Sequence, residues 1–432
     1  MKRRLLPILM TLVLVCALPI WAAFVTSGDV TNPLVCTAGA TSSEESAVEK
    51  LKLAISRGGT VQLTEDIEIT QTLYVERSMT IDLNGHVLKM TGDGSVLRVE
   101  EGPHPVTLTI TDSRPQNPHT GSYAGLPAGG VITGGTGTDV PGIHYVGGAV
   151  YLKKGTTLKL EGGTLTGNSC SSIYIDGATF VMSGGTITGE TVGVHNNVGT
   201  FTMTGGRITG CSDRGVYVYN GNMTMSGTAY IGENPNARRE DIYVYESDHK
   251  YTDLSVTGGT IAGKVRIVFL ESLGPTQDDL RAAANSVVKE QGVFDGHIKV
   301  EKGTSGTCVD YNSVNFIDEV AKTRTLKLVL QPNAVEEPET PATVNGREFM
   351  YWTKEGVSEA WDFSTEIKGP LTLYAVRTPA SSSGGYYYYP TTDTKADDAK
   401  GSPKTADPGV ALYAALSLLS LTGLTCTTRK KF

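Results

Sequence analysis

Apolar and polar residues alternate with the same phase in five segments from the middle of the chain. Their apolar positions align in two columns, first Leu158, Phe180, Phe201, Met223 and Leu254, and two residues later Leu160, Met182, Met203, Met225 and Val256. The residues between the columns are mostly polar, namely Lys159, Val181, Thr202, Thr224 and Ser255. A period of two with one apolar face predicts β-strands that each bury one side.

A short glycine-rich phrase recurs beside these strands. It reads Gly-Gly-x-(Ile/Leu/Val)-Thr-Gly or a variant, and it begins at residues 129, 162, 184, 205, 227 and 258, which are 33, 22, 21, 22 and 31 residues apart. A period near 21 to 22 residues is the length of one coil of a three-stranded parallel β-solenoid, and the longer intervals indicate coils with insertions. Glycine pairs suit the corners of such coils, because a corner needs positive φ or a close backbone approach.

These repeats resemble those of the right-handed parallel β-helix proteins of pectate-lyase-like architecture. More narrowly, they resemble the Gly-Gly-x-Ile-x-Gly repeat proteins on the surfaces of Gram-positive gut bacteria. The resemblance covers roughly residues 58–300. It implies an all-β fold whose stacked coils place each apolar column inside a continuous bore.

Helices are predicted at both ends of the solenoid, where an uncovered coil would expose apolar surface. In the segment 24–57, Ser42-Ser43-Glu44-Glu45 forms a capping-box pattern, and the apolar residues that follow fall on one helical face before Gly58-Gly59. That face consists of Val48, Leu51, Ala54 and Ile55. A second segment, from Thr276 to Gln291, is predicted to close the C-terminal end.

The two ends of the chain predict where it works. Residues 1–23 read as a secretory signal peptide, with Lys2-Arg3-Arg4 before an apolar run and Ala22-Ala23 at its end. Residues 402–432 contain Ser402, Pro403, Lys404, Thr405 and Ala406, then an apolar stretch and a basic terminus. That order resembles a sortase sorting signal, altered at both ends of its usual Leu-Pro-x-Thr-Gly motif. The resemblance implies sortase and peptidoglycan as partners and a cell-wall location, and a plain transmembrane tail is the alternative.

Two further regions lie between the solenoid and this tail, after a connector expected at 301–325. Residues 326–378 contain Phe349-Met350-Tyr351-Trp352 and Leu371-Thr372-Leu373-Tyr374-Ala375, which resemble the Listeria-Bacteroides repeat. The resemblance implies a small β-grasp module that serves as a spacer or weak interaction module. Residues 379–401 are rich in Ser, Gly, Thr and Asp and are predicted to be a low-complexity linker.

Composition narrows the possible partners. A formal net charge of -8 with a pI near 5.5 argues against binding to nucleic acid or to anionic membranes. Cys36, Cys170, Cys211 and Cys308 are too few and too scattered for a disulfide framework, so free and buried thiols are expected. No zinc, nucleotide or nucleophile-elbow motif is present, and no cofactor or metal is expected.

Acidic residues near the corners raise the alternative of a polysaccharide lyase or glycoside hydrolase. Such enzymes use clustered carboxylates on an outer face of the fold. Glu190 and Glu233 are separated by two coils with Cys211 between them, and Asp213 stands beside Arg214. Outward acids at solenoid corners are usually solvated, and an acid beside a base is more often a surface ion pair. We therefore favour a protein without catalytic activity and assign no catalytic residue.

The third strand of each coil carries the candidate binding site. Inward residues flank one outward position in each coil, and this position is occupied by Tyr151, Tyr174, His195, Tyr217 and Tyr243. A column of rings on a rigid face suits stacking against sugar rings, although stacked aromatics also stabilise neighbouring strands without any ligand. The sequence thus leads to the hypothesis of a surface display or adhesion protein, with glycan or mucin as the first candidate ligand and a host protein as the second.

Overall fold

The computed structural model describes residues 46–142, 144–233, 240–248, 254–287, 293–303 and 306–379, together with the backbone of 35–38. The signal peptide, the linker from residue 380 onward and the sorting signal predicted above lie outside these residues. No helix in the described ranges is long and apolar enough to cross a bilayer.

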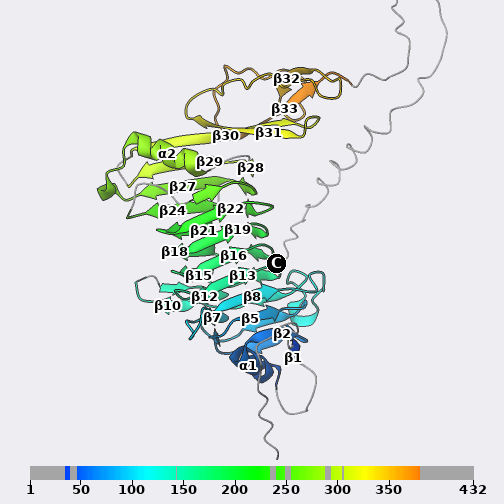
Figure 1. Cartoon of the computed structure of the whole chain (residues 1–432), viewed down its shortest axis with the longest axis vertical. Helices are drawn as coiled ribbons and strands as arrows, with labels where there is room; N and C mark the ends of the chain where they lie inside the picture. Colours follow the sequence, from blue (N-terminus) through cyan, green and yellow to red (C-terminus); the bar gives the residue numbers. More distant parts are fainter. Residues whose placement is uncertain are drawn as a thin grey trace, which may run out of the picture. The chain divides into compact units, whose positions relative to one another are not determined.

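Three long sheets run through the described part of the chain, and parallel strands stack in each of them (Figure 1). The first sheet has the order β1 (Val35–Ala38), β2 (Gly59–Leu63), β5 (Met79–Asp82), β8 (Thr107–Thr111), β13 (Thr157–Leu160), β16 (Thr179–Met182), β19 (Thr200–Met203), β22 (Asn222–Met225) and β25 (Leu254–Val256). The second has the order β3 (Ile67–Ile69), β6 (Val87–Met90), β9 (Val131–Thr133), β14 (Thr164–Thr166), β17 (Thr186–Thr188), β20 (Arg207–Thr209), β23 (Tyr230–Gly232), β26 (Thr260–Ala262) and β28 (Val293–Phe294).

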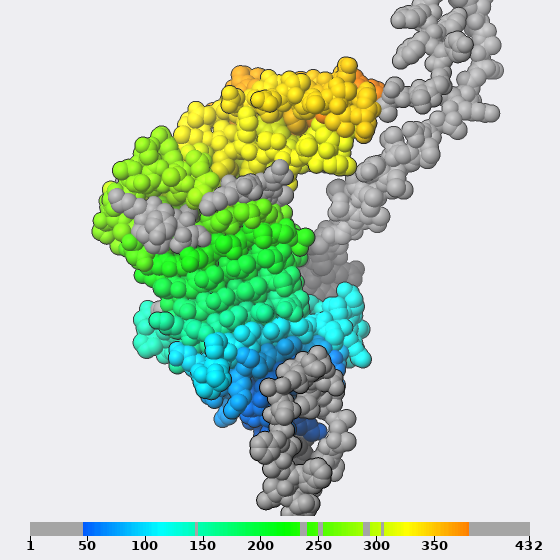
Figure 2. Space-filling model, in the orientation of Figure 1, coloured from blue at the N-terminus to red at the C-terminus, as the bar shows by residue number. Residues whose placement is uncertain are grey.

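The third sheet begins with β4 (Leu73–Val75), β7 (Leu97–Val99), β12 (Val150–Leu152), β15 (Ser171–Asp176), β18 (Val192–Asn197), β21 (Arg214–Tyr219), β24 (Ile242–Glu246), β27 (Lys264–Phe269) and β29 (His297–Lys302). It continues through β30 (Cys308–Asp318), β33 (Leu371–Arg377) and β32 (Phe349–Thr353), and β31 (Thr323–Leu330) pairs with β30. Successive coils contribute one strand to each sheet, which is consistent with a β-helix-like solenoid. Figure 2 shows the coils as adjacent bands that follow the order of the sequence.

The two apolar columns predicted from the sequence face inward. Phe180 pairs in register with Leu158 and Phe201, and Met182 pairs with Leu160 and Met203. All ten side chains of these columns are at most 2% exposed. Phe180 and Phe201 stack with their ring centroids 4.9 Å apart and their planes within 5°. The alternation in the sequence therefore predicted the core of the stacked coils correctly.

One corner position adopts the left-handed backbone conformation in successive coils. Gly189 and Gly210 have φ of 74° and 67°. Pairing of Thr209 with Gly232 places Glu233 at the same position in the next coil, and its φ is 57°. Glu233 is thus equivalent to these glycines and not to Glu190, which lies one residue further along its own coil.

A helix covers each end of the bore, as predicted. Helix α1 (Ala47–Arg57) buries Leu51 and Ile55, and its last turn is closed by Gly58. The N-cap of α1 is Ser46, whose side-chain hydroxyl accepts a hydrogen bond from the Glu49 backbone N–H, and the predicted capping box at residues 42–45 lies outside the described residues. Helix α2 (Gln277–Val287) buries four apolar side chains, and these belong to the same core as the inward columns.

Short elements occupy the insertions between coils. Strands β10 (Thr138–Val140) and β11 (His144–Val146) form an antiparallel hairpin inside the first long repeat interval. Two 3₁₀ turns, η1 (Gly121–Tyr123) and η2 (Glu271–Leu273), lie in the loops before β9 and α2. The first long repeat interval thus marks structure added between strands.

A second, smaller core follows the solenoid. It consists of Val314, Phe316, Val329, Val335, Trp352, Ile367 and Leu373. Residues 308–312 of β30 pair with β29, and residues 314–317 pair with β33, so one strand joins both cores. The region expected to be a connector therefore contains β30, an 11-residue strand. A buried ion pair between Asp318 and Arg377, 2.6 Å apart, fastens β30 to β33.

Candidate functional site

The outward residues of the third sheet form one continuous ladder. Strand pairing brings Tyr151, Tyr174, His195, Tyr217 and Tyr243 into register, as the sequence predicted. The register extends further than predicted, to Arg98 and Tyr74 on one side and to Arg266 and Lys299 on the other. We refer to the nine residues from Tyr74 to Lys299 as the outward ladder.

The rings of the outward ladder contact one another. Their centroids are 5.3 Å apart for Tyr151 and Tyr174, 4.9 Å for Tyr174 and His195, 4.6 Å for His195 and Tyr217, and 5.3 Å for Tyr217 and Tyr243. These distances lie within the range of favourable aromatic pairs. His195 and Tyr217 are stacked, whereas the other three pairs are tilted or edge to face, so neighbouring rings cover one another only in part.

Two of the five predicted rings are covered. Tyr151 is 5% exposed and Tyr174 is fully buried, and both pack against Val146 with Val140 beside them. These two valines belong to the β10–β11 hairpin. The expectation that these rings face solvent is therefore wrong for Tyr151 and Tyr174. The repeat spacing signalled an insertion here, but nothing in its sequence showed that it would fold back over the sheet.

Burial also changes the chemistry of these side chains. It raises the pKa of Tyr174 to about 12, and it raises the pKa of Tyr151 further, with added effect from the hydrogen bond that the Tyr151 hydroxyl donates to Asp176. Burial lowers the pKa of His195 to about 4, and the nearby Arg214 lowers it as well. His195 is consequently neutral at pH 7 and contributes an uncharged ring to the ladder.

The later half of the ladder is only partly buried. His195, Tyr217 and Tyr243 each retain some exposure. The Arg214 guanidinium lies 4.4 Å from the centroid of Tyr243 and 5.4 Å from that of Tyr217, so it covers part of their faces. Beside them Tyr219 and Tyr245 form a second stack, with centroids 5.6 Å apart and planes within 7°. This second stack was not predicted from the sequence, which indicated a single column of outward rings.

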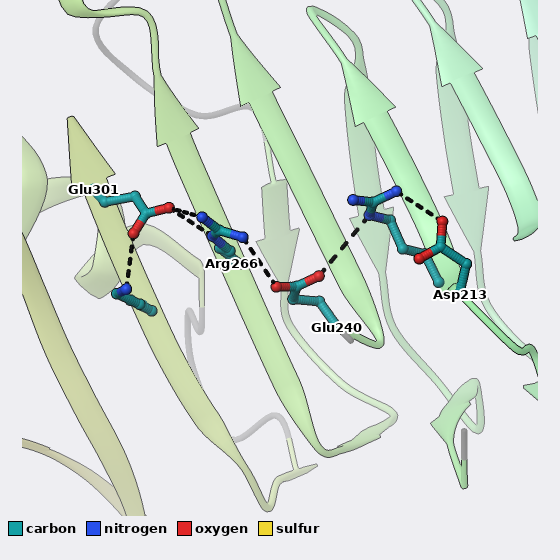
Figure 3. A network of polar contacts seen from close by, with 6 residues as sticks. Asp213, Glu240, Arg266 and Glu301 are labelled. Carbon is teal, nitrogen blue, oxygen red and sulfur yellow. Dashed lines mark hydrogen bonds and ion pairs between the residues drawn. The ribbon is translucent and has the colours of Figure 1, made fainter. Parts of the chain in front are cut away.

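A chain of ion pairs crosses the last strands of the same face (Figure 3). Arg214 lies 3.0 Å from Asp213 and 3.9 Å from Glu240. Arg266 lies 3.4 Å from Glu240 and also pairs with Glu301, which Lys299 approaches to 2.9 Å. Three acidic and three basic side chains alternate along this network, so their formal charges cancel.

The network borders a shallow pocket at this end of the ladder. The pocket has a volume of about 260 Å³ and is lined by Glu240, Lys264, Val265, Arg266, His297 and Lys299. This volume is slightly below the range of about 300–1,000 Å³ typical of ligand sites. It suits a single small ring better than an extended ligand.

Glu190 and Glu233, the carboxylates considered for a lyase or hydrolase, lie in different environments. Glu190 is 1% exposed, and its two carboxylate oxygens accept hydrogen bonds from the backbone and side-chain N–H groups of Asn168. Burial raises the pKa of Glu190 to about 7. Glu233 is exposed at the surface, where it contacts Arg207 and Tyr230. The expectation of a solvated acid is therefore wrong for Glu190, and the pair shares no common site.

The burial of the cysteine side chains differs in part from the prediction. Cys170, Cys211 and Cys308 form no disulfide bond, as predicted. Cys211 is buried, and burial raises its pKa to about 12, but Cys308 is exposed and Cys170 is partly exposed. Within the described ranges, no three His, Cys, Asp or Glu side chains are grouped so that they could hold a metal ion.

Comparisons of the chain with protein-family models, with curated proteins and with solved structures find no match. The features that bear on function are the geometry of the outward ladder and the sequence signals at the two ends of the chain. The ladder and its neighbours offer partly exposed rings, paired charges and a shallow pocket on the later strands of the third sheet.

Proposed function

We propose that this chain is an exported surface protein that acts by display or adhesion and not by catalysis. In this proposal the stacked coils form a right-handed β-helix, residues 1–23 direct export, and residues 402–432 attach the protein to peptidoglycan through sortase. The support for attachment is the order of Ser402–Ala406, the apolar stretch and the basic terminus. Cell-wall attachment would hold the solenoid outside the cell.

The module after the solenoid is proposed to be a β-grasp domain of the Listeria-Bacteroides type. Its own core, in which Phe316 and Trp352 meet edge to face at 5.1 Å, supports a separately packed unit. Its strands extend the third sheet through β30. We propose that it serves as a spacer between the solenoid and the linker 379–401.

The proposed ligand is a glycan, bound at the open half of the outward ladder. The observation that carries this proposal is the combination of two partly exposed tyrosine pairs, the tilted pair Tyr217 with Tyr243 and the stacked pair Tyr219 with Tyr245, beside the pocket at Arg266. The exposed parts of the rings supply apolar contact for a sugar, and the paired carboxylates and guanidinium groups supply hydrogen-bond acceptors and donors. Because the charges of the network cancel, this surface favours an uncharged or weakly charged saccharide over a polyanion.

A polysaccharide panel tests this proposal. The full chain is incubated with pectins, plant glycans and mucin glycans, and both retention and the appearance of new reducing ends or unsaturated products are measured. We expect retention of at least one glycan without product, and loss of that retention in a Tyr243→Ala, Tyr245→Ala variant whose thermal unfolding is unchanged. Sustained product formation would instead support the lyase or hydrolase alternative, and retention that survives both substitutions would remove the ladder from the site.

A further inference from the structure

A groove lies at the opposite end of the third sheet from the Arg266 pocket. It lies between helix α1 and strand β4 and has a volume of about 430 Å³. Ile55 of α1 and Leu73 of β4 contribute buried apolar side chains, and Tyr74, Glu76 and Arg77 contribute exposed ones. The volume falls within the usual range for small-molecule sites, and the lining combines apolar and polar groups.

Tyr74 is the exposed ring of this groove. It is 55% exposed, and it is the one aromatic side chain among the large exposed hydrophobic residues of the described ranges. Among the described strands, β4 is the terminal one of the third sheet, so Tyr74 has a ladder neighbour on one side only. That neighbour, Arg98, places its guanidinium 4.7 Å from the centroid of Tyr151 and pairs with Glu100. The Tyr74 ring is therefore accessible, unlike the covered rings further along the ladder.

Two charged side chains beside Tyr74, Glu76 and Arg77, are free to bind a ligand, and the charges around the ring balance. Lys52 is paired with Glu49 at 3.0 Å. Within the part of the chain that the structure describes, Glu76 and Arg77 make no ion pair with each other or with any other residue. Each therefore offers a planar, bidentate group to a ligand, the carboxylate as an acceptor and the guanidinium as a donor. The formal charges of these four side chains cancel.

We propose that the α1–β4 groove is a second binding site and that it takes a neutral saccharide unit. An exposed ring next to the apolar floor of Ile55 and Leu73 suits the apolar face of a sugar. Glu76 and Arg77 suit neighbouring hydroxyl groups, and the balanced charge gives no preference for an anion. This site is distinct from the one proposed at Tyr243, since six strand spacings, about 29 Å, separate β4 from β24. A short oligosaccharide cannot occupy both.

Protection of Tyr74 from chemical nitration tests this site directly. The full chain is treated with tetranitromethane in the presence of cellotetraose, maltotetraose, xylotetraose or mannotetraose, and nitration of each tyrosine is read by mass spectrometry. We expect Tyr74 to be the most reactive tyrosine of the described ranges, and at least one neutral tetrasaccharide to protect it. If none protects it, or if tetragalacturonate protects it better in a salt-sensitive manner, the proposal is wrong.

Calorimetric titration with the protecting tetrasaccharide then assigns the contacts. Tyr74→Ala should weaken binding at least about tenfold, as expected for loss of an aromatic anchor, whereas Tyr74→Phe should stay within about threefold. Arg77→Gln should weaken it as well, and Tyr243→Ala should leave it unchanged. Unchanged binding in Tyr74→Ala overturns this site. Loss only in Tyr243→Ala overturns it while supporting the ladder, so the two proposals fail separately.

Discussion

The buried carboxyl group of Glu190 predicts a specific dependence of stability on pH. Its pKa is raised from 4.5 to about 7, chiefly because burial disfavours the charged form. A difference of this size corresponds to about 3 kcal/mol. Because the pKa in the folded protein lies above that of the unfolded chain, the unfolded chain releases its proton first as pH rises. The stability contributed by the protonated form is thus complete below about pH 4.5 and is lost as pH rises through about 7.

Replacing Glu190 by Gln isolates this effect, since Gln cannot ionise. We expect the free energy of unfolding of Glu190→Gln, minus that of the wild type, to increase by about 2 kcal/mol between pH 5 and pH 7 and by about 3 kcal/mol in total at higher pH. Urea unfolding at several pH values measures this difference, from which the other titrating groups cancel. Glu161→Gln, at an exposed carboxyl group of the preceding coil, is the matched control and should show no such trend. A difference for Glu190→Gln that does not change with pH would refute the reasoning.

Two further predictions concern the core and the corners. Phe201→Ala removes one ring of the stack with Phe180 and should lower the free energy of unfolding in urea by about 3–5 kcal/mol. Thr202→Ala, on the outer side of the same strand, should lower it far less. Similar losses in the two variants would mean that the two faces of the strand are assigned incorrectly. Glu233→Gly should be more stable than Glu233→Ala by about 1 kcal/mol, because both lose the contact with Arg207 but only Gly relieves the positive φ. Equal stability of these two variants would argue against strain at this corner.

Much of the architecture followed from residue order because each coil repeats one local pattern. Columns such as Phe180–Phe201 were predictable, since a period of two fixes which side chains share a face and the repeat length fixes the register between coils. The exposure of Tyr174 was not predictable, because it depends on a hairpin inserted between two repeats. The position of Glu233 was misjudged by one residue, because a glutamate replaces the expected glycine and only the backbone angle reveals the equivalence.

Glu190 and Tyr74 show that the exposure of a single outward side chain could not be predicted from the sequence. Whether an acid at a corner is solvated or buried depends on which groups of the adjacent coil reach it, and for Glu190 these are the N–H groups of Asn168. Whether an outward tyrosine is open depends on which segments pack over it or beside it, and the described part of the sheet has no strand beyond that of Tyr74. The alternation of apolar and polar residues alone does not show which groups surround Glu190 or which side of Tyr74 is left open.

The outward ladder divides into a closed middle and two open ends, and this division suggests separate roles. Tyr151 and Tyr174 lie under the hairpin, where each cross-strand pair adds about 0.2–1 kcal/mol of stability and no ligand can reach the rings. Tyr74 lies at one open end, and Tyr243 with the ion-pair network lies toward the other. Because the same hydrogen-bonded sheet carries both ends, their spacing is set by the number of strands between them. A polymer with repeated units could therefore contact both ends at once, and its affinity would exceed that of a short oligosaccharide without any additional contact.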